Sequence, residues 1–513
     1  MRIVLVSPYS QLTTLGIRVL SSYLKRKGHS TRLVFMPDVV SMATNGVDFV
    51  GNYPDRAVDQ LVELCQDAGL VGFSLATNYF HKVGDLTDRV RERISVPVVW
   101  GGVHPTVSPE ECLEHADYVC VGEGEEALLE LAGRLEEEER PLDVPNMMVR
   151  KEGREVMNPL RPLISDLDSV PPPDYSLDDH HVLLGDEIVP LTELLMREFW
   201  TAGSNFDEAD SVVYETIWTR GCPYHCSFCI NDYLLELYQG ERFYRKRSVE
   251  HLMSELVSMR EMYPWFNRLV FVDDCFAAVK LDDLRAFTER YRDEIGLPFF
   301  CLLTEDYMIE KRLQPLLRAG LNRAEVGLQS ASDRTNRLYK RGHFSPDQLV
   351  ERSLELQRMT DGSCELTYDI ILDNPFESVD SIIRTFEVAM RLPQPRKLQL
   401  FSLTYFPGTE LHKKALEEGV IEDPRAHYLK EDHHREARYV NILFTLLNKG
   451  APGWLLKVLS FRPLVKLMET PPLRFLIRLL NPLYHGLLKA MNTGGAKERF
   501  ALILNRIHNR GRS

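Results

Sequence analysis

The first 140 residues alternate short apolar runs with longer stretches of helical periodicity. One helical stretch runs from Leu15 to Lys27 and stops at Gly28, a residue type common just after helix ends. Continuous apolar strands separated by helices are typical of a parallel sheet covered on both faces. The pattern therefore predicts a doubly wound, Rossmann-like α/β domain over residues 1–142. Its strand-like runs are Ile3 to Val6, Thr31 to Phe35, Leu70 to Ser74, Val96 to Trp100 and Tyr118 to Val121.

Proline interrupts this pattern between residues 143 and 210. Pro145 and Pro159 precede three consecutive prolines, Pro171 to Pro173, which helices and central strands do not accommodate. We therefore expect a linker over 143–210 and a second α/β domain over 211–424. The second region contains six strand-like runs: Val213 to Trp218, Arg268 to Val272, Pro298 to Leu303, Ala324 to Gln329, Tyr368 to Leu372 and Lys397 to Thr404.

Residues 425–513 change in both periodicity and charge. Their pattern is helical, and residues 451–513 hold eleven Lys or Arg against two Glu, a net charge of +9. Since the whole chain carries −14, the first 450 residues carry −23. Basic amphipathic helices interrupted by proline can lie on a membrane surface, and they can also pack on the preceding domain. Both interpretations stay open for this helical carboxy-terminal region.

The composition describes a globular protein with more than one domain. Of its 513 residues 44% are hydrophobic and 27% are charged. Nine cysteines, of which three are grouped, do not form a secreted disulfide framework. The first apolar run is too short for a signal peptide, and no run reaches the roughly 20 residues needed to span a bilayer. We expect a cytoplasmic protein, with the inner face of the membrane as a second candidate location, and no nucleic-acid partner.

Three cysteines lie on one short segment with the spacing C-x3-C-x2-C: Cys222, Cys226 and Cys229. Thiolates so spaced can converge on one metal centre, and these soft ligands select zinc, copper(I) or iron-sulfur clusters. A structural zinc site usually needs four ligands, and no second C-x2-C or H-x3-H motif lies near enough to complete one. Three cysteines suit a 4Fe-4S cluster with one iron left open.

The segment from Thr219 to Cys229 closely resembles the cluster-binding loop of the radical S-adenosylmethionine (radical SAM) enzymes. The resemblance implies a partial (β/α)6 barrel over residues 211–424 and a cluster held by Cys222, Cys226 and Cys229. It also implies that S-adenosylmethionine (SAM) binds the open iron and is cleaved by one electron from the reduced cluster, which gives a 5′-deoxyadenosyl radical. Reduced flavodoxin or ferredoxin is the expected electron donor.

The same resemblance assigns candidate SAM contacts at strand ends. Asp273 and Asp274 follow the second strand of the barrel, where a carboxylate would pair with the ammonium of SAM, although Asp274 could equally cap the following helix. Gln329 and Ser330 stand where the family has a G-I-E-S segment, and the amide of Gln329 can still bond ribose or carboxylate. Phe228, just before the third cysteine, is expected against the adenine.

Small and turn-forming residues gather at the carboxyl ends of the amino-terminal strands, where doubly wound sheets bind ligands. Glycine there lets the backbone approach a bulky ligand, although a tight turn needs glycine in any case. No G-x-G-x-x-G motif follows the first strand, which argues against a dinucleotide. The candidate positions are Ser74, Thr77, Gly101, Gly102, His104, Gly122, Glu123 and Gly124.

Taken together, these strand ends resemble the cobalamin-binding domain that is fused ahead of some radical SAM cores. No D-x-H-x-x-G motif is present, so the resemblance implies a cobalamin without a protein imidazole ligand. His104 could approach the corrin, or it could be satisfied within the protein.

A chain with both domains is expected to be a cobalamin-dependent radical SAM enzyme. The first hypothesis is a methyltransferase that methylates an unactivated carbon of a small-molecule or lipid-like substrate. A radical cyclase, oxidase or rearrangement enzyme would use the same cofactors without net methyl transfer. A non-catalytic cobalamin or iron-sulfur sensor is the alternative outside the enzymes.

Overall fold

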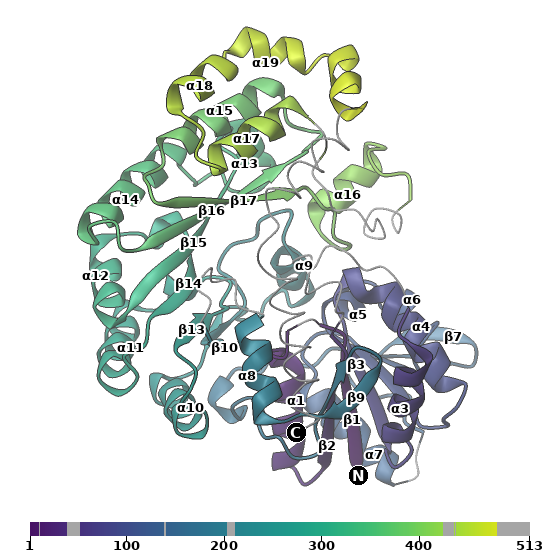
Figure 1. Ribbon diagram of the computed structural model, residues 1–513. Coiled ribbons are helices and arrows are strands. Elements are labelled where there is room, and N and C mark those ends of the chain that lie inside the picture. Colours follow the sequence, from purple (N-terminus) through teal and green to yellow (C-terminus); the bar gives the residue numbers. More distant parts are fainter. Residues whose placement is uncertain are drawn as a thin grey trace.

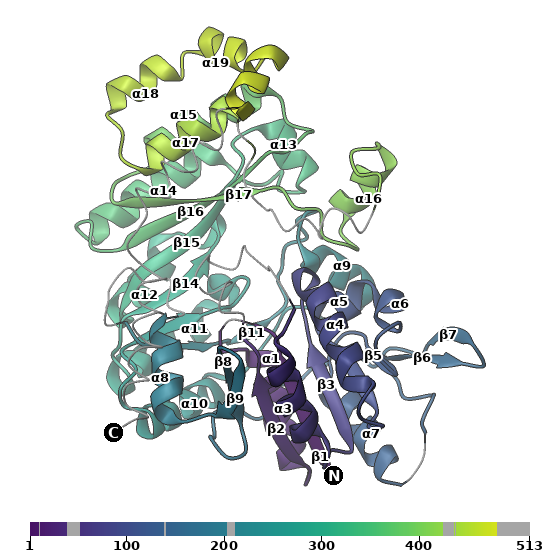
Figure 2. The same cartoon turned by 45° about the vertical axis from the view of Figure 1, so that its right-hand side comes forward.

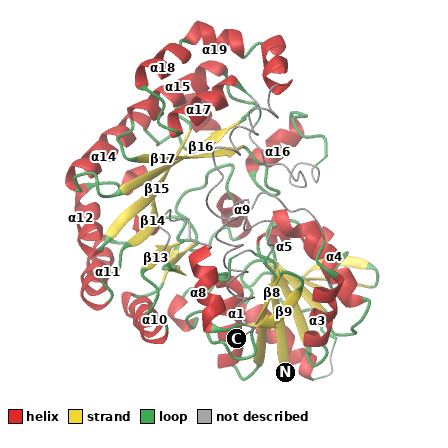
Figure 3. Ribbon diagram, viewed as in Figure 1, coloured by secondary structure: helices red, strands yellow, loops and turns green. Residues whose placement is uncertain are grey.

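The structure is a computed structural model that describes residues 1–9, 11–37, 52–137, 140–202, 211–423, 436 and 438–479. Figure 1 shows two sheets side by side, the amino-terminal one in purple and blue and the second in teal and green. A group of yellow-green helices covers the far end of the second sheet. Figure 3 shows helices packed around the strands of both sheets, as expected for α/β domains.

The amino-terminal domain is built on a nine-stranded sheet with the order β7-β6-β5-β4-β3-β1-β2-β8-β9. Its five central strands, β5 to β2 in that order, are parallel. Alternate residues of β1 enter two different cores, because Ile3 and Leu5 pack with α1 and α7 while Val4 and Val6 pack with α3 and α4. The doubly wound domain is therefore present, with both faces of the sheet covered.

The bounds of these elements follow the predicted pattern closely. The strands are β1 Arg2–Ser7, β2 Ser30–Phe35, β3 Leu70–Ser74, β4 Val98–Gly101 and β5 Tyr118–Cys120. The helices are α1 Leu15–Arg26, α3 Asp55–Cys65, α4 Phe80–Arg91, α5 Val103–Val107, α6 Pro109–Cys112 and α7 Glu125–Glu136.

Much of the stretch expected to be a linker adds strands to this sheet. An antiparallel hairpin extends one edge and a second hairpin extends the other. Short hairpins with half-exposed residues carry a weak hydrophobic pattern, which explains why periodicity did not predict them. The added elements are β6 Met147–Lys151, β7 Arg154–Met157, β8 His181–Leu184, β9 Glu187–Pro190 and α8 Glu193–Ala202.

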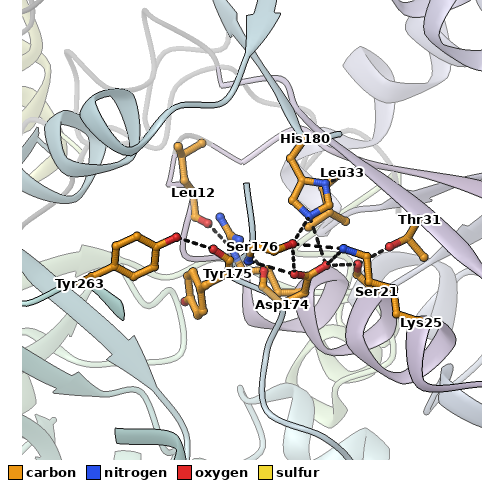
Figure 4. Close-up of polar contacts among 11 residues, drawn as sticks. Leu12, Ser21, Lys25, Thr31, Leu33, Asp174, Tyr175, Ser176, His180 and Tyr263 are labelled. Carbon is orange, nitrogen blue, oxygen red and sulfur yellow. Dashed lines mark hydrogen bonds and ion pairs between the residues drawn. The ribbon is translucent and has the colours of Figure 1, made fainter. Parts of the chain in front are cut away.

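The proline-rich segment before β8 is fixed by a buried polar network centred on Asp174 (Figure 4). The Asp174 carboxylate accepts a hydrogen bond from Ser21 of α1 at 2.5 Å and pairs with Lys25 at 2.7 Å. His180 lies 3.1 Å from the same carboxylate, while its other ring nitrogen accepts from the Leu33 backbone. Because the partners come from α1 and β2, the segment is tied firmly to the amino-terminal sheet.

The second sheet contains six parallel strands in the order β10-β13-β14-β15-β16-β17, the partial barrel that was predicted. Figure 1 shows its helices along the outer side of the curved sheet. The strands are β10 Val213–Thr216, β13 Arg268–Phe271, β14 Phe299–Leu303, β15 Leu321–Gln329, β16 Glu365–Leu372 and β17 Arg396–Ser402. The outer helices are α10 Val249–Met262, α11 Leu281–Glu294, α12 Glu310–Ala319, α14 Pro346–Met359 and α15 Val379–Arg391.

The carboxy-terminal helices pack on the last part of the barrel, as Figure 2 shows. They are α17 Tyr439–Asn448, α18 Gly453–Leu459 and α19 Arg462–Met468, and both α17 and α19 contact α15. Arg438, just before α17, forms a buried ion pair with Glu469 at 3.1 Å. Within the described residues, no helix is both long enough and apolar enough to cross a bilayer.

Candidate functional site

The three cysteines lie on a loop whose start is fixed by a short two-stranded ladder. β11 Thr219–Arg220 pairs with β12 Arg245–Lys246 just before the first cysteine. Gly221 has φ +81°, and a Cβ there would meet the Phe243 carbonyl oxygen at 2.6 Å, so this turn needs glycine. The hydroxyl of Ser227 donates to the Leu338 carbonyl at 2.7 Å and ties the middle of the loop to the barrel. The turn at Gly221 and the hydrogen bond of Ser227 therefore fix the loop at its start and in its middle.

The thiols of Cys222, Cys226 and Cys229 are half-buried and influence one another's ionisation. A contact with Cys275 and burial raise the pKa of Cys222, and burial raises the pKa of Cys229 to about 12. Among the described residues no three His, Cys, Asp or Glu are close enough to surround a single ion. Ligands of a four-iron cluster bind different irons and stand further apart than ligands of one ion. Three thiols on one loop, which metal binding would deprotonate, fit such a cluster.

The two aspartates at the end of β13 differ in their surroundings. Asp273 is fully buried and accepts hydrogen bonds from the Trp218 and Thr219 backbone amides at 3.1 and 2.6 Å. Burial raises its pKa to about 6. Asp274 is exposed and its carboxylate influences the ionisation of Cys229. Of the two, only Asp274 is placed to meet a ligand beside the cysteine loop.

The other candidate SAM contacts also differ in whether their side chains already have protein partners. Gln329 ends β15 with φ +55°, and its buried Oε1 has no hydrogen-bond partner within the described residues. Such an orphaned acceptor in a strained backbone suits a ligand donor such as a ribose hydroxyl. Ser330 is buried and donates to Glu377 at 2.7 Å. Phe228 packs edge-on against Tyr339, with ring centres 5.0 Å apart.

Several charged residues inside the barrel were not singled out from the sequence. Arg341 is buried and donates to the Gly327 carbonyl at 2.8 Å. Glu305 accepts from the Ser345 amide at 3.1 Å, and burial raises its pKa to about 7. Arg341 influences the ionisation of both Glu305 and Cys226, so these groups share one region.

Glu325 and Asp369 add a carboxyl pair to this region. The two carboxyl groups lie on neighbouring strands β15 and β16 and influence each other's ionisation. Burial, together with the Glu325 charge, raises the pKa of Asp369 to about 9. One proton held by the pair lets Asp369 donate as well as accept at neutral pH. Glu325 could have been found from the inward polar positions of β15, but Arg341 lies in a loop without periodicity.

The strand ends of the amino-terminal sheet surround a cavity of about 350 Å³. Its wall is largely apolar, with contributions from Leu5, Val99 and Leu128. Two residues of the second domain, Ile217 and Arg220, complete the lining. Six of the eight predicted positions line the cavity: Ser74, Gly101, Gly102, Gly122, Glu123 and Gly124. A glycine-edged apolar cavity fits a large ligand that inserts one of its apolar parts.

Thr77 and His104 lie apart from this cavity. His104 is fully buried, its Nε2 lies 3.1 Å from Glu111, and its Nδ1 lies 3.3 Å from Thr77. Among the described residues, therefore, the ring nitrogens of His104 face protein partners. These contacts agree with the interpretation that His104 is satisfied within the protein. A corrin ligand from His104 would require these contacts to be broken.

The rim residues Gly122 to Glu125 contact the cysteine loop directly. Arg220 pairs with Glu123 at 2.9 Å and with Glu125 at 2.6 Å. A Cβ on Gly122 would lie 1.7 Å from the Tyr238 hydroxyl, at the end of α9 Ile230–Leu237. Glycine at this position therefore admits Tyr238. The predicted ligand-binding rim is also the contact surface between the domains.

Two family models match the chain. The B12 binding domain matches residues 1–132, and the radical SAM superfamily matches residues 216–386. An uncharacterized methyltransferase of Pyrococcus horikoshii is 24% identical over 69% of this chain and 71% of its own. The bacteriochlorophyllide d C-8(2)-methyltransferase of Chlorobaculum tepidum is 23% identical over 69% and 70%. The anaerobic magnesium-protoporphyrin IX monomethyl ester cyclase of Rubrivivax gelatinosus is 22% identical over 73% and 61%.

Solved structures of cobalamin-dependent radical SAM proteins have the same fold. OxsB with aqua-cobalamin bound superposes with a TM-score of 0.65 over 98% of this chain and 83% of that chain, at 14% identity. The methyltransferase TsrM from Kitasatospora setae, with cobalamin and a [4Fe-4S] cluster bound, gives a TM-score of 0.61 over 81% and 78%, at 17% identity. Identities this low establish similarity of fold alone.

Proposed function

Because this chain belongs to the radical SAM enzymes that carry an amino-terminal cobalamin-binding domain, we propose that it methylates an unactivated carbon of a small-molecule or lipid-like substrate. The observation that carries the proposal is the shared cavity, since the strand ends of one domain and Arg220 and Ile217 of the other line the same space. Two relatives are named methyltransferases, which supports methyl transfer over other outcomes.

The residues that would hold the cofactors follow from the site. When bound, the iron-sulfur cluster and SAM supply a radical that takes hydrogen from carbon, and cobalamin supplies the methyl group. Cys222, Cys226 and Cys229 would ligate the cluster. Asp274 would pair with the SAM ammonium, and Gln329 Oε1 would accept from a hydroxyl.

The buried charges of the barrel would orient SAM rather than react. Arg341 is placed to pair with a carboxylate, because burial leaves its guanidinium poorly solvated. Asp369 and Glu325 would hold one proton between them, and the protonated carboxyl would donate a hydrogen bond to a ligand acceptor while the pair keeps a single negative charge. On the cobalamin side, the glycine edges and apolar wall exclude water and hold an apolar surface.

A product measurement tests the proposal. Metabolites from cells with and without the gene should include one compound whose mass differs by a single CH2 unit. The purified, anaerobically reconstituted protein should then add that unit to the lighter compound, with the new carbon coming from the methyl group of labelled SAM. Conversion without a gain of CH2 would reject methyl transfer. Reduced flavodoxin or ferredoxin is the electron donor we propose for this assay.

A radical cyclase is the second candidate function. The relative from Rubrivivax gelatinosus is named a cyclase and matches 73% of this chain. A cyclase would form product without a CH2 gain, while it would still form 5′-deoxyadenosine. The same product measurement therefore separates the two candidates.

We also propose peripheral membrane contact through the carboxy-terminal helices, which would suit a lipid-like substrate. Large apolar side chains that are more than half exposed gather there: Trp454, Val458, Phe461, Leu467, Phe475, Leu476 and Leu479. Basic side chains lie among them, although Arg462 and Lys466 also pair with Glu387 and Asp380. Apolar groups beside bases favour an anionic bilayer surface.

Vesicle flotation tests this contact with the full chain. Wild-type protein should float with vesicles that contain anionic lipid, and a Trp454→Ser, Phe461→Ser, Phe475→Ser variant should not. Met262→Ser is the matched control, because Met262 is similarly exposed on α10. Equal flotation of all three proteins, or none by wild type, would reject the contact.

A further inference from the structure

The loop that carries the cysteines is attached to the cobalamin-binding rim by a cluster of four charged side chains. Arg220 immediately precedes Gly221 and Cys222, and its guanidinium pairs with Glu123 at 2.9 Å and Glu125 at 2.6 Å. Arg245 donates to Glu123 from the other side, at 2.9 and 3.1 Å. Since Arg220 and Arg245 are register partners in the β11–β12 ladder, both arginines are held side by side.

The carboxylates are equally constrained. Glu125 is in the first turn of α7, where the helix dipole favours negative charge, and its side chain is only 6% exposed. Glu123 Oε2 accepts from the Ile164 amide at 2.8 Å, and Arg245 donates to the Ile164 carbonyl at 2.7 Å. Burial opposes ionisation of Glu123, but the two arginines outweigh it and lower its pKa. The cluster therefore matches two arginines with two carboxylates.

A second contact brackets the loop on its other side. α9 begins immediately after Cys229, and the Tyr233 hydroxyl at its middle donates to the Thr106 carbonyl of the amino-terminal domain at 3.3 Å. At the end of the same helix, Tyr238 fills the space over Gly122. The amino-terminal domain thus holds the cysteine loop immediately before its first cysteine and again along the helix after its last one.

We propose that Glu123 and Glu125 are positioning residues, which set the place of the cysteine loop relative to the cobalamin rim through Arg220 and Arg245. Buried ion pairs contribute little net stability compared with apolar packing, so their effect here is on geometry. Arginine suits the task, because one planar guanidinium can reach two carboxylates in fixed directions. The inference rests on the proposed function, in which the two cofactors act on one substrate.

The consequence is specific to reactions that need both sites. Loosening the attachment would leave the cluster and SAM sites unchanged, because none of the four charged residues is a cluster ligand. Glu123, Glu125 and Arg220 also line the apolar cavity, so bound cobalamin is quantified in every variant and variants are compared at equal occupancy. A step that depends on the separation of the sites would suffer, since a displacement of about 1 Å can reduce a rate by about 100-fold. Radical formation within the barrel needs only the cluster and SAM, so it should be nearly unchanged.

Electron spin resonance tests the proposal without a substrate. Full-length protein would be reconstituted with iron, sulfide and cobalamin, and reduced without SAM to give the paramagnetic cluster and cob(II)alamin. Wild type should show one well-defined spin–spin coupling. The Glu123→Gln, Glu125→Gln variant should keep its cluster and, compared with wild type at equal cobalamin occupancy, show a broadened or weakened coupling. Arg220→Lys should be intermediate, because lysine keeps the charge but cannot reach both carboxylates in fixed directions.

Glu130→Gln is the matched control. Glu130 also pairs with an arginine, Arg161, but not with the cysteine loop, so the coupling should match wild type. A coupling in the double variant that equals wild type would overturn the proposal. Loss of the cluster in both the double variant and Arg220→Lys would overturn it as well, because the residues would then be needed for folding of the loop.

A second readout separates this inference from the proposed function. Per bound cobalamin, formation of methylcobalamin from SAM and reduced cobalamin should fall about 10- to 100-fold in the double variant, while 5′-deoxyadenosine formation stays within about twofold per cluster. A wild-type protein that makes no methylcobalamin would contradict methyl transfer, and the spin coupling would still decide the role of the two glutamates.

Discussion

The two halves of the site use opposite physical means to receive their ligands. The cavity of the amino-terminal sheet is largely apolar and edged by glycine, and the charged side chains at its border, Glu123 and Arg220, are paired with each other. The barrel instead contains buried ionisable groups with raised or lowered pKa values, among them Glu305, Arg341 and Asp369. A bulky, largely apolar cofactor is held by shape, whereas a small zwitterion such as SAM needs directed charges and hydrogen bonds.

The largest effect is expected from a substitution in the cysteine loop. Cys226→Ala should reduce 5′-deoxyadenosine to background and remove the visible absorption of the cluster, because two thiols cannot retain it. Cobalamin binding should be unchanged, since Cys226 is absent from the lining of the apolar cavity. Absorption spectra and mass spectrometry would measure both quantities. Loss of cobalamin from this variant would mean that the halves are not separable.

The converse variant places a larger side chain in the apolar cavity of the amino-terminal sheet. A Cβ at Gly101 would meet only Cys120, at 3.7 Å, so Gly101→Val should fold while its extra methyl groups enter the cavity. Overpacking of about 1–3 kcal/mol should weaken cobalamin binding about 10- to 100-fold, with 5′-deoxyadenosine formation retained. Equilibrium dialysis gives the affinity.

The matched control for this variant is Gly133→Val. Gly133 lies in α7 with open space around it and does not line the cavity. Its variant should bind cobalamin like wild type. Equal affinity in Gly101→Val and wild type would place the corrin elsewhere.

The smallest expected effect is on the pH dependence of stability, to which the ionisable groups of the barrel contribute. The pKa of Asp369 is about 9 in the folded protein and about 4 when unfolded, so folding takes up a proton between these values. The free energy of unfolding should therefore fall as pH rises from about 4 to about 9. The amide in Asp369→Asn cannot ionise. The fall in its free energy of unfolding over this pH range should therefore be smaller than that of wild type, by on the order of 1–3 kcal/mol.

Thermal unfolding at pH 6 and pH 9 would measure the difference between the two proteins. The melting temperature of wild type should fall further than that of Asp369→Asn. A larger fall in the variant would have the wrong sign for a neutral Asp369. Glu365→Gln is the control, because Glu365 pairs with Arg323 near the start of the same strand and its carboxylate has a cationic partner.

Sequence patterns predicted the parallel strands of both sheets and singled out the cysteine loop, because buried parallel strands read as apolar runs and ligand spacing is local. They did not predict the edge hairpins β6–β7 and β8–β9 of the first sheet. They were less informative about side chains whose role depends on partners distant in sequence. Asp273 and Asp274 are adjacent, yet one is buried under Trp218 and Thr219 and the other is exposed. Glu123 looked like a rim residue, and only the tertiary structure brings Arg220, 97 positions later, into contact with it.

The most direct test of the account is the formation of 5′-deoxyadenosine by the wild-type protein. After anaerobic reconstitution with iron, sulfide and hydroxocobalamin, and reduction in the presence of SAM, the protein should form 5′-deoxyadenosine in amounts that scale with its cluster content. Mass spectrometry would quantify the nucleoside. Protein that contains the full cluster and bound cobalamin but forms no 5′-deoxyadenosine would contradict radical catalysis and favour a cobalamin or iron-sulfur sensor.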